Sequence, residues 1–484
     1  MLLATSVWIL PYLILVVGLV QAVLRLRSPV GKLPGPKYTA MTSLILKYKE
    51  FTHERRLYIH KLHQRYGPVV RLAPNEVSFA TVDAIKEIYM SGGSGYDKTP
   101  FYSLFTQFKT RTLFSTLPRG DHSYMKRYLA DRYANTNIMK PEILDGILDH
   151  ARDCLNRCMQ ACSSAQGYAD IYVHLHCFAL DGVTLQLFHP YGTHANKIEK
   201  DYRLMKELSY HDSLKSNLAL YYMPWVTDII HYFNPPKPAP LSNEYVLKTS
   251  ETPSPSPFSL LSKLQAQAKA TNMPQYAVPA ECKDHLAAGV DTTGDALCFL
   301  MHQLSLPDHE SRRIQARLHK ELAGNPTTPF DQLPYLDAIV KEGLRCFPPI
   351  PMSFPRFVPQ GGSAIEGYFI PGGTIVSCQP YTIHKDPNVF PQPLEFQPER
   401  WLDKEDAQAL VERNRWFFAF GVGGRGCLGK HLAIAEMKIL LREVYSQCRT
   451  TISSKMDSDM EMEDQIIASR PKGQCCKLVF EKLS

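Results

Sequence analysis

The sequence predicts a mainly α-helical (α+β) protein, with one large helical domain, small β-sheets and an N-terminal transmembrane helix. Three observations lead to this prediction: apolar residues recur at helical spacing through most of the chain, extended runs are short, and the first residues are apolar and uncharged. Of the 484 residues, 44% are hydrophobic and 21% are charged, which is typical of a folded globular protein. We find no internal repeat, and we expect an anchor in residues 1–27 and one domain in residues 28–484.

The expected anchor is the uncharged stretch from Leu2 to Leu24, LLATSVWILPYLILVVGLVQAVL. As a helix it would span roughly 34 Å, against about 30 Å of bilayer hydrocarbon. Arg25, Arg27 and Lys32 follow at once, and by the positive-inside rule they keep the rest of the chain cytosolic. The alternatives are a buried helix or a cleaved signal peptide, but a signal peptide would have a basic start and a shorter apolar core.

Charge and cysteine usage narrow the class of protein. The formal net charge of +7 is modest and the basic residues are scattered, which gives little support for a nucleic-acid partner. The twelve cysteines include no C-x-x-C, and Cys475 and Cys476 are adjacent, too close for a routine bridge. We expect most cysteines to be reduced and buried, in a reducing compartment.

Helical spacing dominates from residue 51 to about 230. Residues 234–257, rich in proline and serine, predict a surface connection. Apolar residues three and four apart predict a long helix from Pro279 to Leu306, and a second helix from Tyr335 to Phe347. The expected extended runs include GPVVRLAPNEVSFA (67–80) and GTIVSCQPY (373–381).

Near the C-terminus, the segment FGVGGRGCLG surrounds Cys427 with five glycines. A cysteine kept for packing needs neighbours that fill space, whereas glycines let the backbone turn sharply or lie close to a flat group. The pattern F-x-x-G-x-R-x-C-x-G resembles the haem-ligating loop of the cytochrome P450 family. The alternative is a glycine-rich turn with a packed cysteine.

The resemblance implies a role for each of these positions. Cys427 would be the axial thiolate ligand of haem b, its sulfur protected by backbone N–H groups. Gly421 would permit the turn that presents those groups, and Gly429 would let the next helix lie close to the ring. Phe420 would cover the proximal face, and Arg425 would pair with a haem propionate.

Glu342 and Arg345 lie three residues apart on the second predicted helix and share one of its faces. Such a pair is most often exposed and contributes little to stability. However, the later segment PERW supplies Arg400, which resembles the arginine that closes a buried Glu–Arg–Arg network in the family. We therefore expect these three residues to support the proximal haem side and to be structural.

The segment AGVDTT, residues 288–293, lies in the middle of the long predicted helix. It resembles the family segment that crosses the distal haem face, where small residues leave room for dioxygen. The resemblance implies that Asp291 and Thr292 form an acid–alcohol pair that delivers protons. The alternative is that these residues cap a helix that begins after Gly289.

Three more residues are expected at the haem propionates. Arg356, in FPRFVP, resembles a propionate-binding position of the family. His122 and Lys126 stand where the family often has the tryptophan and arginine of W-x-x-x-R, so both depart from the pattern, although both can donate hydrogen bonds.

The resemblance covers nearly the whole chain and implies a haem-thiolate monooxygenase. Its electrons would come from NADPH through NADPH-cytochrome P450 reductase, with cytochrome b5 as an optional second donor. Docking is expected on the proximal face, with positive charge from Arg425, Lys430, His431 and Lys438. The chain resembles fungal microsomal members acting on specialised metabolites, which implies a single-pass protein of the endoplasmic reticulum membrane with a cytosolic catalytic domain.

Two other functions remain open at this point: a haem-thiolate isomerase or dehydratase that uses no dioxygen, and a non-catalytic haem-binding membrane protein. The segments TPFYSLFTQFKTRTLF, YYMPWV, PPIPMSFP and QIIASRP lie where family members line their substrate pockets. Four phenylalanines of the first segment suggest a hydrophobic substrate, although core packing also explains them. They are Phe101, Phe105, Phe108 and Phe114.

Overall fold

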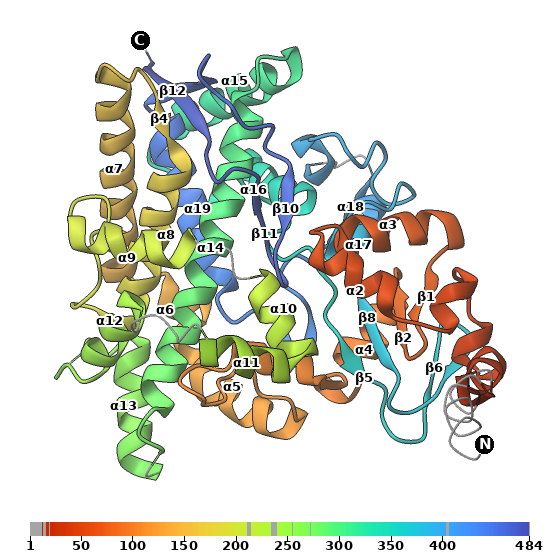
Figure 1. The fold of residues 1–484 in the computed structure, drawn as a ribbon. Helices are drawn as coiled ribbons and strands as arrows, with labels where there is room; N and C mark the ends of the chain where they lie inside the picture. Colours follow the sequence, from red (N-terminus) through yellow and green to blue (C-terminus); the bar gives the residue numbers. More distant parts are fainter. Residues whose placement is uncertain are drawn as a thin grey trace.

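The structure is a computed structural model that describes residues 12, 16–18, 20–210, 214–233, 240–253, 255–271, 273–402 and 406–483. Most long helices lie together in one half of the molecule, and the largest sheet lies in the other half (Figure 1). The predicted anchor, Leu2 to Leu24, lies for the greater part outside the described residues. The helices are α2 (Leu44–Phe51), α3 (Arg55–Tyr66), α4 (Val82–Met90), α5 (Arg119–Tyr133), α6 (Asn135–Ile138), α7 (Pro141–Ser163), α8 (Ile171–Phe188), α9 (Glu199–Ser209), α10 (Leu214–Tyr222), α11 (Pro224–Phe233), α12 (Leu241–Ser250), α13 (Leu260–Thr271), α14 (Ala277–Ser305), α15 (His309–Gly324), α16 (Pro334–Cys346), α17 (Pro380–Ile383), α18 (Ala407–Trp416) and α19 (Lys430–Tyr445).

The strands form one five-stranded sheet, in the order β1-β2-β8-β5-β3, and three smaller sheets. The predicted extended run at 67–80 is the antiparallel hairpin β1–β2, and the run at 373–381 contains β8, which pairs with β2 in parallel. The predicted small β-sheets are therefore confirmed. The strands are β1 (Val69–Ala73), β2 (Glu76–Phe79), β3 (Asp97–Lys98), β4 (Ala169–Asp170), β5 (Arg356–Phe357), β6 (Ser363–Ile365), β7 (Tyr368–Ile370), β8 (Ile375–Cys378), β9 (Cys448–Ile452), β10 (Met462–Asp464), β11 (Ser469–Pro471) and β12 (Lys477–Lys482).

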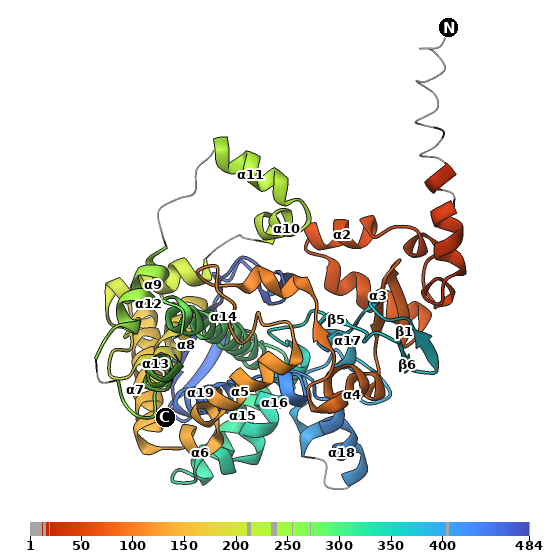
Figure 2. The ribbon, with the colours of Figure 1, turned by 90° about the horizontal axis from the view of Figure 1, so that it is seen from below.

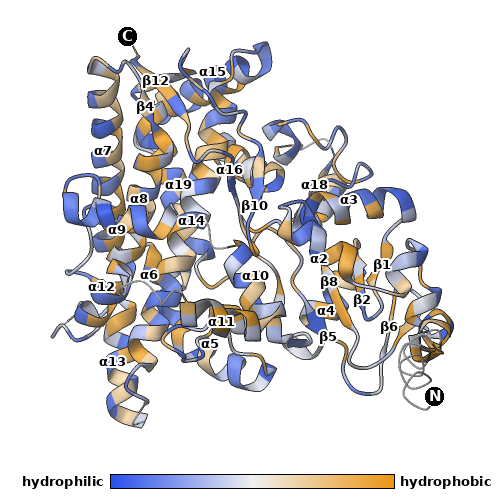
Figure 3. Ribbon diagram, viewed as in Figure 1, coloured by the Kyte–Doolittle hydropathy of each residue, from blue (hydrophilic) through white to orange (hydrophobic). Residues whose placement is uncertain are grey.

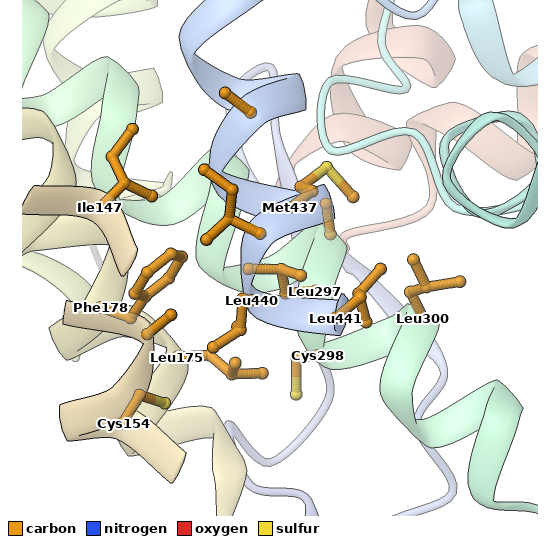
Figure 4. Packing of buried hydrophobic residues seen from close by; sticks show 14 of the residues in the cluster. Ile147, Cys154, Leu175, Phe178, Leu297, Cys298, Leu300, Met437, Leu440 and Leu441 are labelled. Atoms are coloured by element: carbon orange, nitrogen blue, oxygen red, sulfur yellow. The ribbon is translucent and has the colours of Figure 1, made fainter. Parts of the chain in front are cut away.

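The main core lies between helices α7, α8, α14 and α19 (Figure 4). Phe178 of α8, Leu297 of α14 and Leu440 of α19 are fully buried there. Helix α8 is apolar along much of its length, whereas α9 on its outer side is mostly hydrophilic (Figure 3). Among the described residues, α8 alone is long and apolar enough to cross a bilayer, but 89% of it is buried inside the protein. We therefore assign α8 to the core of the domain.

The two predicted long helices are confirmed as α14 and α16. Helix α14 continues through Gly289 without a break, so the alternative in which Asp291 and Thr292 cap a helix start is wrong. A Cβ atom at Gly289 would lie 2.6 Å from the side chain of Val183 on α8. Gly289 therefore allows the close packing of α8 against α14, rather than ending the helix.

The prediction for residues 234–257 was partly wrong, because part of this stretch forms helix α12. Pro240 stands at the N-cap of α12, where a proline does not interrupt helical hydrogen bonds. Val246 is fully buried in the main core. Tertiary packing of this apolar side chain stabilises a helix that the proline and serine content of the flanks concealed.

Candidate active site

The Cys427 loop lies between α18 and the start of α19. Of the twelve cysteines, nine are buried and two are partly buried, and Cys427 is the exposed one. The backbone N–H of Cys427 donates to the carbonyl oxygen of Phe420 at 2.7 Å. Gly421 adopts a φ of 61°, which favours glycine, so the sequence places glycine where the turn requires it. A Cβ at Gly424 would lie 2.7 Å from Ser94 Oγ, so the loop also packs closely against its neighbours.

Local electrostatics act in both directions on the Cys427 thiol. Although the Cys427 side chain is exposed, the protein atoms around it reduce its solvation and raise the pKa of the thiol, while the backbone N–H of Gly429 and the charges of Lys126 and Lys430 oppose that rise. A bound metal ion deprotonates a coordinating thiol outright. The arrangement is therefore compatible with a thiolate ligand once a metal is bound.

A cluster of cationic side chains lies next to this loop, and we call it the cationic cluster. Lys98 of β3 stands opposite Arg356 of β5 in the antiparallel ladder, and like charges in such positions repel each other. The nearest carboxylate partner of Arg425 is Asp97, at 3.5 Å and half exposed. The cationic members are Lys98, Lys126, Arg356 and Arg425, and we include His122, a neutral imidazole beside them, in the cationic cluster.

The repulsion within the cationic cluster changes the pKa of its members. Burial lowers the pKa of Lys98 well below its usual value, and Arg356 and Arg425 lower it further. Burial and the neighbouring cations lower the pKa of His122 to about 2 and, chiefly through burial, that of Arg425 to about 10. Buried cations that repel one another in this way are stabilised by an anionic ligand.

Several donors of the cationic cluster are buried and have no hydrogen-bond partner among the described residues. They include the Nε atoms of Arg356 and Arg425 and the Nδ1 atom of His122. Lys126 Nζ donates to the carbonyl oxygen of Gly426 at 2.6 Å, which attaches helix α5 to the Cys427 loop. A buried donor without a partner is costly, so these atoms fit a group with carboxylate oxygens, such as the propionates of haem.

Lys98 was missed by the sequence analysis. Its ammonium group is buried and donates to the carbonyl oxygen of Phe114 at 2.5 Å. The surrounding sequence, YDKTP, carries no recognisable motif. Only the pairing of β3 with β5 brings Lys98 to Arg356, and that pairing joins segments far apart in the sequence.

Helix α14 exposes small residues in its middle. Ala287 and Ala288 are exposed, although most residues on either side along the helix are buried. The hydroxyl of Thr292 donates to the carbonyl oxygen of Ala288 at 2.6 Å. An open space beside alanines is what the predicted distal face requires, and it fits a flat ligand with room for a small molecule.

Asp291 is held on the side of α14 that faces α8 and α9. Ser209 Oγ donates to Asp291 Oδ1 at 2.9 Å. His176 of α8 is fully buried, and its Nε2 atom lies 3.3 Å from Asp295 Oδ1 and 4.0 Å from Asp291 Oδ1. A Cβ at Gly294 would overlap the His176 ring, at 2.7 Å, so this glycine makes room for the imidazole. The structure thus places Asp291 in a hydrogen-bonding environment beside Thr292.

The predicted Glu–Arg–Arg network is present and buried. Arg345 makes two hydrogen bonds of 2.8 Å to the Glu342 carboxylate, and Arg400 Nε donates to it at 3.0 Å. The indole N–H of Trp401 and the backbone N–H of Gln397 also donate to Glu342, each at 2.9 Å. These contacts lower the pKa of Glu342 despite its burial.

The four segments expected to line a substrate pocket meet at one cavity of about 340 Å³. Phe101, Tyr221, Met352 and Ile466 represent the four segments in its wall. Phe105 lines a second cavity of about 140 Å³ together with Asp291 and Asp295. The other two phenylalanines pack elsewhere: Phe108 stacks on Tyr276, and Phe114 packs against Tyr102 and Phe105.

Two of the four residues expected at the electron-transfer surface, Lys438 and Arg425, are not available there. Lys438 is buried, and its ammonium group lies 2.6 Å from Asp337 Oδ1. The first turn of α19 is exposed, but residue 438 lies two turns later on the face that packs against α16. Lys430 is exposed and His431 is exposed beside it, whereas the side chain of Arg425 is 2% exposed and points inward.

Comparison with known proteins agrees with this geometry. The family model described as Cytochrome P450 matches residues 33–477. The chain is similar to cytochrome P450 monooxygenase orf2 of Aspergillus niger, with 26% identity over 92% of each chain. It is also similar to monooxygenase stcB of Emericella nidulans, with 27% identity over 94% of this chain and 89% of the relative, and to monooxygenase cpaH of Aspergillus oryzae, with 29% identity over 88% and 84%. The chain therefore belongs to the cytochrome P450 family, and its fold and activity are those of a cytochrome P450 monooxygenase.

Proposed function

We propose that this monooxygenase inserts one oxygen atom of dioxygen into a hydrophobic organic substrate, an intermediate of a specialised metabolite. Its electrons would come from NADPH through a partner reductase. The observation that carries the proposal is the exposed Cys427 in a glycine-rich loop next to the cationic cluster. The thiol lies beside buried donor atoms that have no hydrogen-bond partner among the described residues. A ligand with both a metal ion and carboxylates, such as haem b, fits this combination.

Haem b with a cysteine thiolate ligand supplies oxygen activation, because the thiolate donates electron density that favours cleavage of the O–O bond. In this chain Cys427 would be the ligand, and Phe420 would cover the proximal face. Gly429, where a Cβ would meet nothing within 4 Å, leaves space for the ring beside the start of α19.

The cationic cluster would bind and orient the propionates. Arg356 and Arg425 each keep a buried Nε donor for this purpose, and His122 keeps Nδ1. Lys126 already contacts the Cys427 loop, so its role is to attach that loop as well as to balance charge. Lys98 joins the four residues expected from the sequence because it lies opposite Arg356.

Asp291 and Thr292 would move protons on the distal side. The Thr292 hydroxyl donates to Ala288, so its oxygen can accept a hydrogen bond from a water molecule and hold it. Asp291 would resupply the proton, with Ser209 and His176 fixing the position of its carboxylate. A positioned proton donor of this kind is typically worth about 10²–10⁴-fold in rate.

The larger cavity is lined by the four expected segments but by no residue of α14 or of the Cys427 loop, so we infer from it the chemistry of a substrate on its way to the haem site. Aromatic and aliphatic side chains form much of its wall, which suits a hydrophobic molecule. One side is polar: Arg55 lies 2.8 Å from Glu76, and the hydroxyl of Tyr222 donates to Glu50 at 2.7 Å. The cavity therefore favours a substrate with an apolar body and a polar group at one end.

A membrane anchor and the endoplasmic reticulum membrane complete the proposal. Helices α2, α10 and α11 lie on one side of the molecule, the side toward which residues 20–27 extend (Figure 2). Leu44 of α2 and Trp225, Tyr232 and Phe233 of α11 expose 64–83% of their surfaces there. Exposed apolar groups on one side favour contact with lipid. Exposed Lys430 and His431 remain candidates for docking of the reductase, with cytochrome b5 as a second donor.

The test is Cys427→Ala, in membranes and in purified protein. We expect the substitution to abolish the red-shifted Soret band of the ferrous carbon monoxide complex, because no thiolate would remain at the iron. Cys475→Ala, at a partly buried cysteine, is the control and should keep the band. A band that survives in Cys427→Ala would contradict the assignment of the ligand.

A further inference from the structure

A second group of metal-binding side chains lies away from the proposed haem site. Helix α7 carries His150 and Asp153 three residues apart, so both project from one face of the helix. The segment after α8 brings His194 to the same place, and one ligand atom from each of the three residues lies within 4.8 Å of the others. The two imidazole rings are 5.3 Å apart. We call these three residues the α7 cluster.

His150 is the buried member of the α7 cluster. Its side chain is nine-tenths or more buried, and its Nδ1 atom has no hydrogen-bond partner among the described residues.

A buried carboxylate organises the α7 cluster from behind. Asp181 Oδ2 lies 3.9 Å from His150 Nδ1. Asp181 also accepts hydrogen bonds of 2.7 Å from the Thr193 hydroxyl and the Ala195 backbone N–H, the two neighbours of His194. One carboxylate thus fixes the backbone on both sides of His194. It also faces Nδ1 of His150, which leaves Nε2 of that ring as the atom that would coordinate a metal, with the carboxylate behind it.

The carboxylate of the α7 cluster, Asp153, forms an ion pair with a lysine. Lys197 Nζ lies 2.7 Å from Asp153 Oδ2, and 59% of the lysine side chain is exposed. The lysine end of this ion pair is exposed, whereas the Asp153 side chain is only 13% exposed, so the lysine can move into solvent if another cation takes its place at the carboxylate. Lys197 thus places a positive charge at the Asp153 carboxylate, where a bound metal ion would place one.

We propose that His150, Asp153 and His194 bind a zinc ion, with a water molecule as the fourth ligand. Two imidazoles and a carboxylate are donors that suit zinc. Zinc–ligand distances of about 2.0–2.2 Å require ligand atoms about 3.4 Å apart in a tetrahedral site, so the α7 cluster must contract. The exposed side chain of His194 makes this contraction possible, and it opens the site to solvent.

The zinc ion would join α7 to the segment after α8. It shares no residue with the proposed haem site, so it would act on stability and not on oxygen chemistry. A ligand that binds only the folded chain raises the midpoint of unfolding in proportion to its affinity. The proposal is independent of the identity of the monooxygenase substrate.

The test is equilibrium dialysis of haem-loaded full-length protein, made without a polyhistidine tag, against zinc chloride, with metal analysis by mass spectrometry. We expect one zinc ion per chain and a higher midpoint of thermal unfolding. His194→Ala, at an exposed position, should weaken binding at least about tenfold, whereas the control His309→Ala, at an exposed histidine of α15, should not. Lys197→Met should bind zinc more tightly, because it removes the competing cation.

Two results would overturn the proposal. Wild-type protein that binds no zinc when the metal is in excess would show that the α7 cluster does not close. Equal binding by His194→Ala, His309→Ala and Lys197→Met would show that the zinc is held at other surface groups. Because all variants are compared with haem in place, neither result depends on catalytic activity.

Discussion

Buried positive charge is the main electrostatic property of the proposed haem site. Lys98 and Arg356 face each other in the sheet, and the nearest carboxylate of Arg425 is half exposed. Charges buried in this manner destabilise the chain unless an anion compensates them. We infer that the cofactor is needed for the stability of this region as well as for catalysis, since its propionates supply the missing charge.

The Thr292 hydroxyl has a task separate from haem binding. Its described hydrogen bond is to the carbonyl oxygen of Ala288 in the same helix. Thr292→Ala should therefore leave the haem content and the carbon monoxide spectrum unchanged. Without the hydroxyl, proton delivery on the distal side is misdirected, so more of the reduced oxygen should be released as hydrogen peroxide. Product formation should fall by about 10²–10⁴-fold. The measurement is hydrogen peroxide formed per NADPH oxidised.

Thr292→Ser, which keeps a hydroxyl, is the matched control and should behave like the wild type. If peroxide per NADPH is unchanged in Thr292→Ala, the residue has no part in proton delivery. That result would return attention to isomerase or dehydratase chemistry, which needs neither dioxygen nor a reductase.

Single residues differ in how far the sequence reveals them. Cys427 is conspicuous in the sequence because its glycine neighbours are unsuited to packing and because ten consecutive residues resemble the haem-ligating loop of the family, and its role as the ligand stays a prediction. Lys98 could not, because its place beside Arg356 depends on strand pairing. Lys438 was misplaced because a lysine in a helix is usually exposed, and only the contact with Asp337 on α16 shows otherwise.

The network on α16 should stabilise this helix against the segment that follows β8. Glu342→Ala leaves Arg345 and Arg400 buried without their carboxylate, which should lower the free energy of unfolding by about 3–5 kcal/mol. We expect low haem content and a lower midpoint in urea unfolding. The control is Asp149→Ala, which removes an exposed pair with Arg152 at the same spacing and should cost less than about 1 kcal/mol.

Helix α19 carries a buried acid whose protonation should make stability depend on pH. Burial raises the pKa of Glu436 to about 8, and the Thr293 hydroxyl only partly offsets the rise. The unfolded chain loses this proton near pH 4.5 and the folded chain near pH 8. The protonated Glu436 therefore contributes its full stability below pH 4.5, and this contribution is lost as the pH rises to about 8.

Between pH 5 and pH 8 the free energy of unfolding should therefore decrease less in Glu436→Gln than in the wild type, and the difference should be a few kcal/mol. Part of the decrease remains, because burial also raises the pKa of Asp181 to about 7. The measurement is urea unfolding across this pH range, with Glu142→Gln at an exposed position of α7 as the control. Parallel curves for wild type and Glu436→Gln would contradict a protonated Glu436.

For whole elements, the sequence was a good guide where one helix carries a long apolar pattern. Helices α14 and α16 were predicted to within about two residues at each end. Helix α12 was missed, because its stability comes from burial of Val246 against other helices and not from its own composition. Local pattern predicts an element when the element's own residues supply most of its stability.

The substrate cavity is formed by segments that only the complete fold brings together. The sequence identified the four segments, but each is short, and nothing local fixes their distances from one another. In the structure Phe101, Met352 and Ile466 share one wall although more than a hundred residues separate each from the next. The polar side with Arg55 was not expected, because α3 belongs to none of the four segments.

The boundary between the proposed anchor and the domain can be placed from the packing of the N-terminal segment. Val30 and Leu33 are buried in the cluster that also contains strands of the five-stranded sheet. The guanidinium of Arg71, itself buried, donates to the carbonyl oxygens of Leu33 and Pro36, each at 2.9 Å. Residues from about 28 onward are therefore part of the fold, and a deletion that reaches Pro36 removes partners of a buried charge.

Two deletions separate membrane attachment from folding. A chain lacking residues 2–27 should leave the membrane fraction, bind haem and keep its thermal midpoint, because the contacts of Val30, Leu33 and Arg71 are retained. A chain lacking residues 2–36 should also leave the membrane but should lose up to about 3–5 kcal/mol of stability, because Arg71 loses its carbonyl acceptors in the deleted segment and retains only the Thr39 hydroxyl among those described. Both lack the proposed anchor, so their difference reports on residues 28–36 alone. Equal midpoints would place the domain boundary after Pro36, and a 2–27 deletion that stays in the membrane fraction would show that the exposed apolar side chains of α2 and α11 are sufficient for attachment.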